Sequence, residues 1–339
     1  MAVECLCAAH SIFLSSGQDR KPVPYGKALK SLRHSLANIE EALSSEVLCA
    51  IICLSWCEAL INSSSSGWVK HFFGSSRIIQ LRGPQKHQEG FGRALLHAEH
   101  GLLSSASSIA DSSCFLDHIA WQNAVDSPLP ERQDPMKLKI VIEHFNLMTK
   151  LSVLREDLAQ VSLLNSPTTV SLLFDKLQKL YHLRVGFKQN LRLTSVLPDI
   201  LDGGSPPASK DYAIIFCKNA LGHITVNLAL LELQRTYQAA LLNVHFPTTT
   251  PPFPPLPWEN SVMGRQFPPA KHLDLEIDGL VELVSSSFEK ALLATPITSR
   301  RIVFSYRVIC SQVFKQKDYH PVWDRIYAII CRAQSNKSE

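Results

Sequence analysis

Three residues near position 100 are of types that bind metals. His97 and His100 flank Glu99 at helical spacing, and imidazole and carboxylate groups are common zinc ligands. A complete site would need a further ligand, such as Cys114 or His118, that the fold brings close. Because solvated or capping histidines explain the same pattern, the sequence predicts no metal site here.

A second set of residues could line a small-molecule pocket. His118 and Trp121 are three positions apart and would share one helix face, where the imidazole could act as a general base. Glu58 is a single carboxylate near the end of a very apolar helix, and it is expected to pair with a cation such as Arg82 or Lys70. We take Glu58, His118 and Trp121 as candidate pocket residues; packing near the core is the competing interpretation.

The cysteine pattern favours reduced thiols. Of the nine cysteines, Cys49, Cys53 and Cys57 follow one another at four-residue spacing along one helix face. A disulfide between residues one turn apart on a helix is geometrically poor, and three thiols form an incomplete zinc site. The sequence therefore predicts buried free thiols and an intracellular protein.

Catalytic motifs are missing from the sequence. It contains no G-x-S-x-G elbow and no G-x-x-x-x-G-K-[ST] loop, and the glycines at 90 and 92 lack both the third glycine and the strand of a dinucleotide-binding motif. We predict no catalytic residue and no cofactor.

Composition narrows the class of protein further. Hydrophobic residues make up 45% and charged residues 19% of the 339 positions, as in a globular protein with ample core material. A net charge of +4 without a dense basic run gives no nucleic-acid surface. The apolar stretch 47–61 is too short to span a membrane, and no signal peptide is recognisable.

The segment 68–84, WVKHFFGSSRIIQLRGP, has the pattern of an amphipathic helix with a defined end. Its apolar residues recur every three to four positions. Gly83 can take the left-handed conformation that ends a helix, Pro84 cannot continue it, and Arg82 places a cation in the last turn. Within the helix, His71 is expected to be a buried structural imidazole.

The same segment carries a resemblance. It resembles the fungal-specific transcription factor domain, the regulatory region of fungal zinc-cluster activators, through the spaced residues Trp68, His71 and Gly74 and then Ile78, Ile79, Arg82, Gly83 and Pro84. Ser75 departs from the alanine that is usual in that family. The similarity extends through 90–100 and 115–128, and beyond about residue 150 only helical character matches.

The resemblance implies structural roles for these signature residues. Trp68 and His71 would anchor the helix, and Gly74 would let a neighbouring helix approach closely. The closely spaced cysteines of a zinc-cluster DNA-binding module are absent, since Cys5 and Cys7 are followed next by Cys49. The chain is thus similar to a truncated regulator, without its own DNA-binding module.

Hydrophobic periodicity predicts an all-α fold of about a dozen antiparallel packed helices without a significant sheet. The expected helices cover residues 1–14, 27–43, 46–61, 68–81, 91–103, 113–125, 136–164, 167–193, 212–242, 272–294, 296–314 and 321–333. They form one domain over 1–333, with a candidate subdivision near 127–135 and a disordered tail over 334–339. The proline-rich segment 246–257 is interpreted as a rigid connector between helices rather than an SH3 or WW ligand.

The favoured function rests on the resemblance. It implies a nuclear, transcription-regulator-like protein that controls fungal metabolic or secondary-metabolite genes. Its partners would be the transcription machinery or a full-length activator, with a small-molecule effector and a homodimer as further candidates and no membrane contact. Two alternatives stay open: a regulator-like scaffold recruited as a natural-product enzyme such as a cyclase, and a non-catalytic scaffold or dimerisation partner.

Overall fold

The computed structural model describes residues 1–15, 24–61, 67–109, 113–126, 135–161, 167–195, 210–243 and 268–292, together with positions 324, 325 and 328. These residues form helices and short turns, and none of them is in a strand. The predicted all-α class is confirmed. The segments at 127–134, 246–257 and 334–339, and the helix expected over 296–314, lie outside the described residues.

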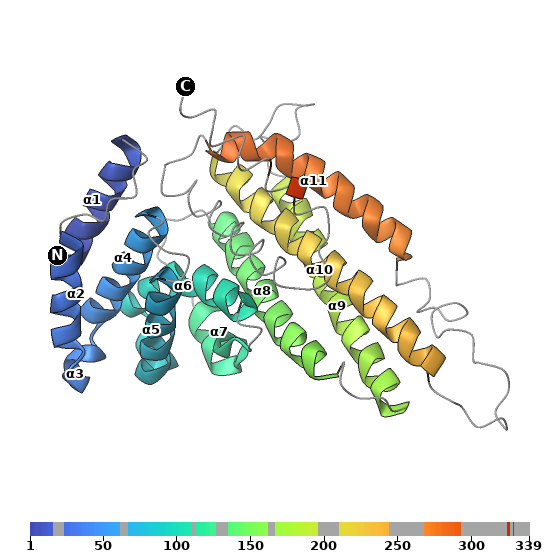
Figure 1. Ribbon diagram of the computed structural model, residues 1–339, viewed down its shortest axis with the longest axis horizontal. Helices are drawn as coiled ribbons and strands as arrows, with labels where there is room; N and C mark the ends of the chain where they lie inside the picture. The colour runs from blue at the N-terminus through green and yellow to red at the C-terminus, as the bar shows by residue number, and fades with distance from the viewer. Residues whose placement is uncertain are drawn as a thin grey trace.

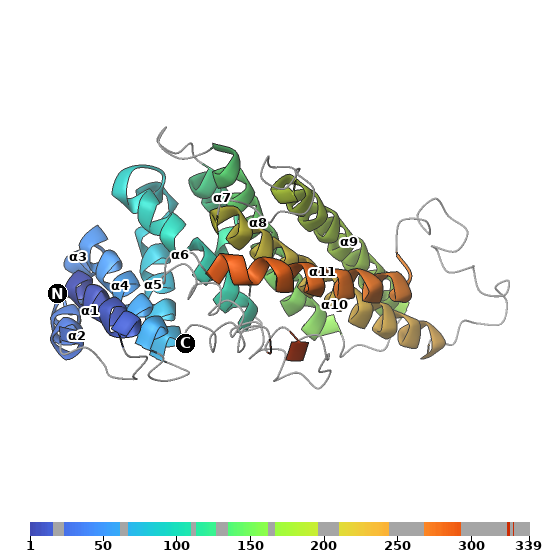
Figure 2. The ribbon, with the colours of Figure 1, turned by 90° about the horizontal axis from the view of Figure 1, so that it is seen from above.

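The elements follow the chain from one end of an elongated assembly to the other (Figures 1 and 2). The first part comprises α1 (Ala2–Ser15), α2 (Pro24–Ser35), α3 (Ile39–Ala42), α4 (Ser45–Ile61), α5 (Gly67–Arg82), η1 (Pro84–His87), α6 (Gly90–Ile109), η2 (Phe115–Asp117) and α7 (Ile119–Asp126). The second part comprises α8 (Pro135–Val161), α9 (Pro167–Ser195), α10 (Lys210–Asn243) and α11 (Ala270–Leu292).

Two predicted helices are wrong in their extent. Instead of one helix over 113–125 the structure has η2 and α7, and His118 is extended between them, so it does not share a helix face with Trp121.

The pattern over 27–43 predicts a single helix, whereas the structure breaks it between α2 and α3. Asn38 is extended there and its Oδ1 accepts a hydrogen bond from the amide of Glu40 at 2.9 Å, the geometry of an N-cap. Leu36 and Ile39 lie on either side of this break and are exposed.

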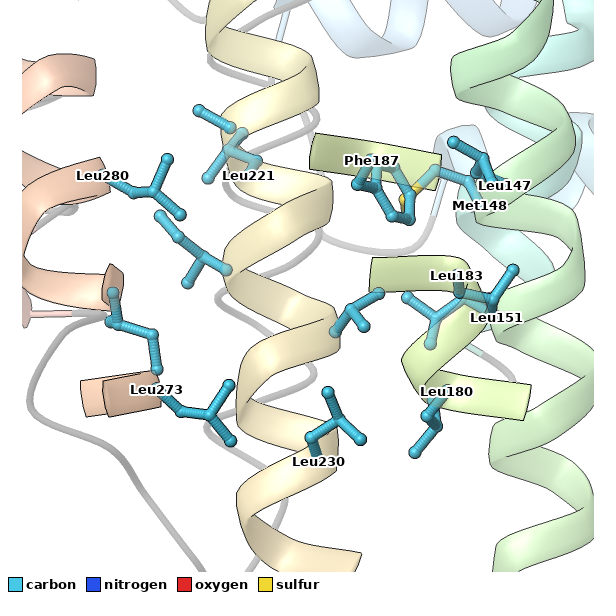
Figure 3. Packing of buried hydrophobic residues seen from close by; sticks show 14 of the residues in the cluster. Leu147, Met148, Leu151, Leu180, Leu183, Phe187, Leu221, Leu230, Leu273 and Leu280 are labelled. Carbon is cyan, nitrogen blue, oxygen red and sulfur yellow. The ribbon is translucent and has the colours of Figure 1, made fainter. Parts of the chain in front are cut away.

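Two hydrophobic cores hold the helices. The first lies among α1, α2 and α4 to α7 and contains fully buried side chains such as Leu48, Leu54 and Ile79. The second lies among α8 to α11, where leucines and Phe187 interdigitate between neighbouring helices (Figure 3). In this second core α9 and α10 approach each other closely at Gly222, where an added Cβ would lie 2.3 Å from the ring of Phe187.

α8 belongs to both cores. Leu147, Met148, Leu151 and Leu154 pack into the second core, while Ile142 packs against the first. The helix therefore lies between α6 and α7 on one side and α9 and α10 on the other, as Figure 1 shows. The two halves of the structure are joined through this shared helix.

An ion network fastens α9, α10 and α11. Glu276 of α11 accepts hydrogen bonds from Arg184, from Lys188 at 3.1 Å and from Asn227 at 3.2 Å. The buried His223 also lies 3.7 Å from this carboxylate. The surrounding cations lower the pKa of Glu276 to about 2, against the opposing effect of burial, so the carboxylate stays ionised at neutral pH.

α10 contains a long apolar stretch. By length and composition alone, Tyr212–Leu241 could cross a membrane, but 78% of its most apolar window is buried inside the protein. α9 and α11 cover it on two sides. The helix is explained as the core element of the second half, as its all-round hydrophobicity predicts.

Polar side chains line the seam around α8. His144 Nδ1 lies 3.2 Å from Asn219 Oδ1, which also accepts a 2.7 Å hydrogen bond from the amide of Asn190. His100 of α6 packs on Phe145 with ring centroids 5.1 Å apart, and it is only 1% exposed. Burial lowers the pKa of both histidines to about 3. The charges of His97 and His144 add to the effect on His100, and the charge of Lys218 adds to the effect on His144, against the hydrogen bond with Asn219.

These histidines make stability depend on pH. In the unfolded chain they titrate near pH 6.5, so below that pH the unfolded state binds more protons and the free energy of unfolding falls as pH decreases. We expect His100→Leu to remove part of this pH dependence. The free energy of unfolding of the variant, taken relative to that of the original chain, should be higher by about 2 kcal/mol at pH 5 than at pH 7. Urea unfolding of the original chain and of His100→Leu at pH 7, 6 and 5 measures these free energies.

The matched control is His34→Leu, because His34 lies exposed on α2. That variant should keep the pH dependence of the original chain. Identical pH slopes for the original chain and His100→Leu would contradict the assignment of His100 as a buried neutral imidazole.

Candidate functional site

The signature segment forms α5, which ends as the sequence predicts. Gly83 has a φ of 75°, in the left-handed region, and its amide bonds the carbonyl of Gln80 at 3.1 Å. Pro84 then opens η1 at its first position, where a missing amide hydrogen has no cost. The chain therefore turns sharply at this point, and the turn sets where α6 begins.

Arg82 joins this turn to a different part of the chain. Its guanidinium donates to the carbonyl of Leu43 at 2.7 Å and to Ser45 Oγ at 2.9 Å, at the junction of α3 and α4. Burial lowers its pKa and the nearby Glu46 raises it. The expected pairing of Glu58 with Arg82 is wrong: backbone and hydroxyl oxygens take up the guanidinium instead.

The last residue of η1, His87, holds this short helix against α6 through its buried imidazole. His87 is fully buried, and its Nδ1 lies 2.8 Å from the carbonyl of Gly92, so this nitrogen carries the hydrogen and donates. Its ring packs on Trp121 of α7, with centroids 5.8 Å apart. Burial, reinforced by the charge of Arg82, lowers the pKa of His87, which therefore stays neutral.

Close approach occurs at Gly92 and not at Gly74. A Cβ at Gly74 would meet no atom within 4 Å, so the expected approach of a neighbouring helix there is wrong. A Cβ at Gly92 would lie 2.0 Å from the backbone oxygen of Lys86. η1 folds directly over the first turn of α6, and only glycine leaves the room for it.

Ser75 has a polar function that alanine could not supply. It is fully buried, and its hydroxyl lies 2.8 Å from the carbonyl of Phe72 and 3.2 Å from Glu99 Oε2. Glu99 on α6 is also fully buried. The departure from the family pattern at this position therefore provides a donor for a buried carboxyl between α5 and α6.

Glu58 belongs to a hydrogen-bonded trio that the sequence did not reveal. The hydroxyl of Tyr25 donates to Glu58, and His71 Nε2 lies 3.1 Å from the same hydroxyl. Because that oxygen donates its hydrogen to the carboxylate, it accepts from His71. Burial and Glu58 raise the pKa of Tyr25, so the phenol remains protonated and links α2, α4 and α5.

The candidate pocket residues fall into two groups. Glu58 lies in the trio just described, whereas Trp121 is buried against Phe115, with ring centroids 4.9 Å apart, and against His87. His118 is exposed, and its carbonyl accepts the amides that open α7. A pocket containing all three residues stays a prediction.

Trp68 is the second residue of α5, and its side chain is not among those that the structure describes. Lys70 is exposed. Among the described residues no group of three or more His, Cys, Asp or Glu has an arrangement that could hold a metal ion.

The outward face of α5 combines apolar and basic residues. Lys70, Phe73, Arg77 and Leu81 recur every three to four residues and are all exposed, Phe73 by 49% and Leu81 by 50%. Gly74 lies on the same face, and a Cβ added there would have no heavy atom within 4 Å. α5 contains no acidic residue at all. We call these five residues the outer face of α5.

The comparisons with known proteins agree with the signature. Residues 2–160 match the family model of the fungal specific transcription factor domain, which confirms the resemblance over α1 to α8. An uncharacterized protein of Emericella nidulans is 37% identical over 98 residues, 29% of this chain and 21% of that relative. No solved structure matches the chain. The match supports a transcription-regulator-like role.

Two glycine variants test the packing assignment. We expect Gly92→Ala to lower the free energy of unfolding by about 2–3 kcal/mol, because a backbone oxygen cannot move aside for the new methyl group. Gly74→Ala should instead raise it by up to about 1 kcal/mol, since alanine favours a helix and meets no neighbour. Thermal and urea unfolding of both variants measure the difference. A loss of stability in Gly74→Ala would refute the assignment.

A second prediction concerns Ser75. Ser75→Ala should lower the free energy of unfolding by about 1–2 kcal/mol, because it deprives the buried Glu99 of a hydrogen-bond donor. Ser76→Ala on the same helix is the matched control, with a change of about 0.5 kcal/mol or less. Equal effects of the two substitutions in urea unfolding would show that Ser75 has no such function.

Proposed function

We propose that this chain is a regulatory region of a fungal transcription factor, that it acts in the nucleus, and that it works through protein contacts made by the outer face of α5. The family match over residues 2–160 supports the class of function. The observation that supports the surface is the exposure of Phe73 and Leu81 on the signature helix. The buried side of that helix is occupied by structural contacts, so its outer side is available to a partner.

The charge of the outer face indicates the chemistry of the partner. Lys70 and Arg77 alternate with the apolar side chains, and α5 has no carboxylate to neutralise them. An amphipathic helix of a partner, with apolar residues at three-to-four-residue spacing flanked by Asp or Glu, would complement this face. The partner would be a component of the transcription machinery or a full-length activator.

Control of metabolic or secondary-metabolite genes, a small-molecule effector and dimerisation stay predictions of the resemblance. None of them is required by the proposed use of α5. The Tyr25, Glu58 and His71 trio is explained by packing, since the phenol and the carboxyl are both buried.

Affinity capture of the full chain from fungal nuclear extract tests the proposal. We expect Phe73→Ala combined with Arg77→Glu to lose specific partners, with their recovery reduced at least tenfold, because an aromatic anchor and a complementary charge are both removed. Quantitative mass spectrometry measures recovery. The lost proteins should be nuclear regulators that contain an acidic amphipathic segment, and reversing its charges should restore binding to Arg77→Glu.

The matched control combines Leu172→Ala on α9 with Lys150→Glu on α8, because both side chains are exposed and distant in sequence from the signature. Its partners should be retained. Loss of the same partners from both double variants, or from neither, would contradict the proposed use of the outer face of α5.

A further inference from the structure

Two cysteines that are far apart in sequence meet where α1 packs on α4. The Sγ atoms of Cys5 and Cys57 are 3.4 Å apart, and both residues are fully buried. The pair differs from the contacts along α4 itself, because it bridges two helices separated by 52 positions. Both thiols are free in this structure.

The distance is suited to bond formation. A disulfide joins its sulfurs at about 2 Å, so the two atoms need to approach by little more than the length of one bond, within reach of side-chain rotation. The intra-helical restriction that excludes a disulfide among Cys49, Cys53 and Cys57 does not apply to residues on two different helices. Among the elements that the structure describes, α1 packs mainly on α2 and α4, so it can separate locally without opening either core fully.

The two thiols are not equivalent. Burial raises the pKa of each, but the hydrogen bond from Cys57 lowers that of Cys5, while the same bond raises that of Cys57. The neighbouring Glu58 raises both. Cys5 is therefore the better nucleophile of the pair, and its reaction should accelerate as pH rises.

We propose that Cys5 and Cys57 form a redox modification site, in which a hydroperoxide converts the two thiols into a disulfide that links α1 to α4. The thiolate of Cys5 attacks the terminal peroxide oxygen, the O–O bond breaks, and water or an alcohol leaves, which gives a sulfenic acid. The sulfur of Cys57 then attacks that of Cys5, and the hydroxyl leaves as water with the proton of Cys57. Two thiols and one hydroperoxide thus give one disulfide, one water and one water or alcohol, and two electrons pass to the peroxide.

The link would hold the first helix against the part of the molecule that contains the signature. Cys57 adjoins Glu58, which binds Tyr25 of α2, and α4 packs on α5. Oxidation would therefore fix α1, α2 and α4 relative to one another. This inference does not depend on the proposed docking function of α5.

Treatment of the purified, reduced full chain with excess hydrogen peroxide tests the site. After alkylation of the remaining thiols and proteolysis without reductant, fragment-ion mass spectrometry should identify a Cys5–Cys57 cross-link in most molecules, and formation should be faster at pH 9 than at pH 7. The thermal unfolding midpoint of the oxidised chain should rise by several degrees.

Cys57→Ser and Cys5→Ala should each abolish the cross-link and the rise in the midpoint, whereas Cys7→Ser and Cys53→Ser should keep both. Circular dichroism of each variant before oxidation confirms that it is folded. If one variant does not fold, the other and the fragment map of the unaltered chain decide the result. A cross-link confined to Cys7 or Cys53, or none after complete reaction, would overturn the proposal.

Discussion

The hydrogen bonds of Arg82 are the constraint on which the first half of the structure depends. One guanidinium connects the end of α5 to the carbonyl of Leu43 and the hydroxyl of Ser45, and so determines how α4 and α5 lie against each other. The turn at Gly83 and Pro84 then directs η1 over Gly92. The hydrogen bond from His87 to the carbonyl of Gly92 holds η1 in this position. Apart from the Ser45 hydroxyl, the acceptors in these contacts are backbone oxygens, so the geometry depends strongly on the path of the chain.

This arrangement separates two functions of the signature helix. Its inner side supplies buried residues such as Ser75 and Ile79 to the first core, and its outer side presents exposed Phe73 and Leu81. The family match ends at residue 160, at the end of α8, yet α8 is packed into the second core through Leu147 and Leu151. The matched region is therefore physically continuous with α9 to α11.

Local chemistry made part of this structure predictable. The end of α5 follows from a glycine and a proline, and the buried α10 follows from its all-round hydrophobicity. Asn38 followed by acidic residues was a cap signal that could have divided the helix expected over 27–43. The partners of Arg82 and of Glu58, the close approach at Gly92 and the Cys5–Cys57 contact could not be predicted in this way. They join residues more distant in the sequence or depend on how η1 folds back, and helical periodicity contains no information about which helices become neighbours.

Hydrogen exchange of an Arg82→Gln variant tests the central structural claim most directly. If Arg82 fixes the turn, exchange should accelerate in the first turns of α4 and α6 and in η1, while α9 to α11 keep their protection. Arg77→Gln, which alters an exposed cation on the same helix, should change none of these segments. Unchanged protection around η1 in Arg82→Gln, or an equal loss of protection in α9 to α11, would contradict the account.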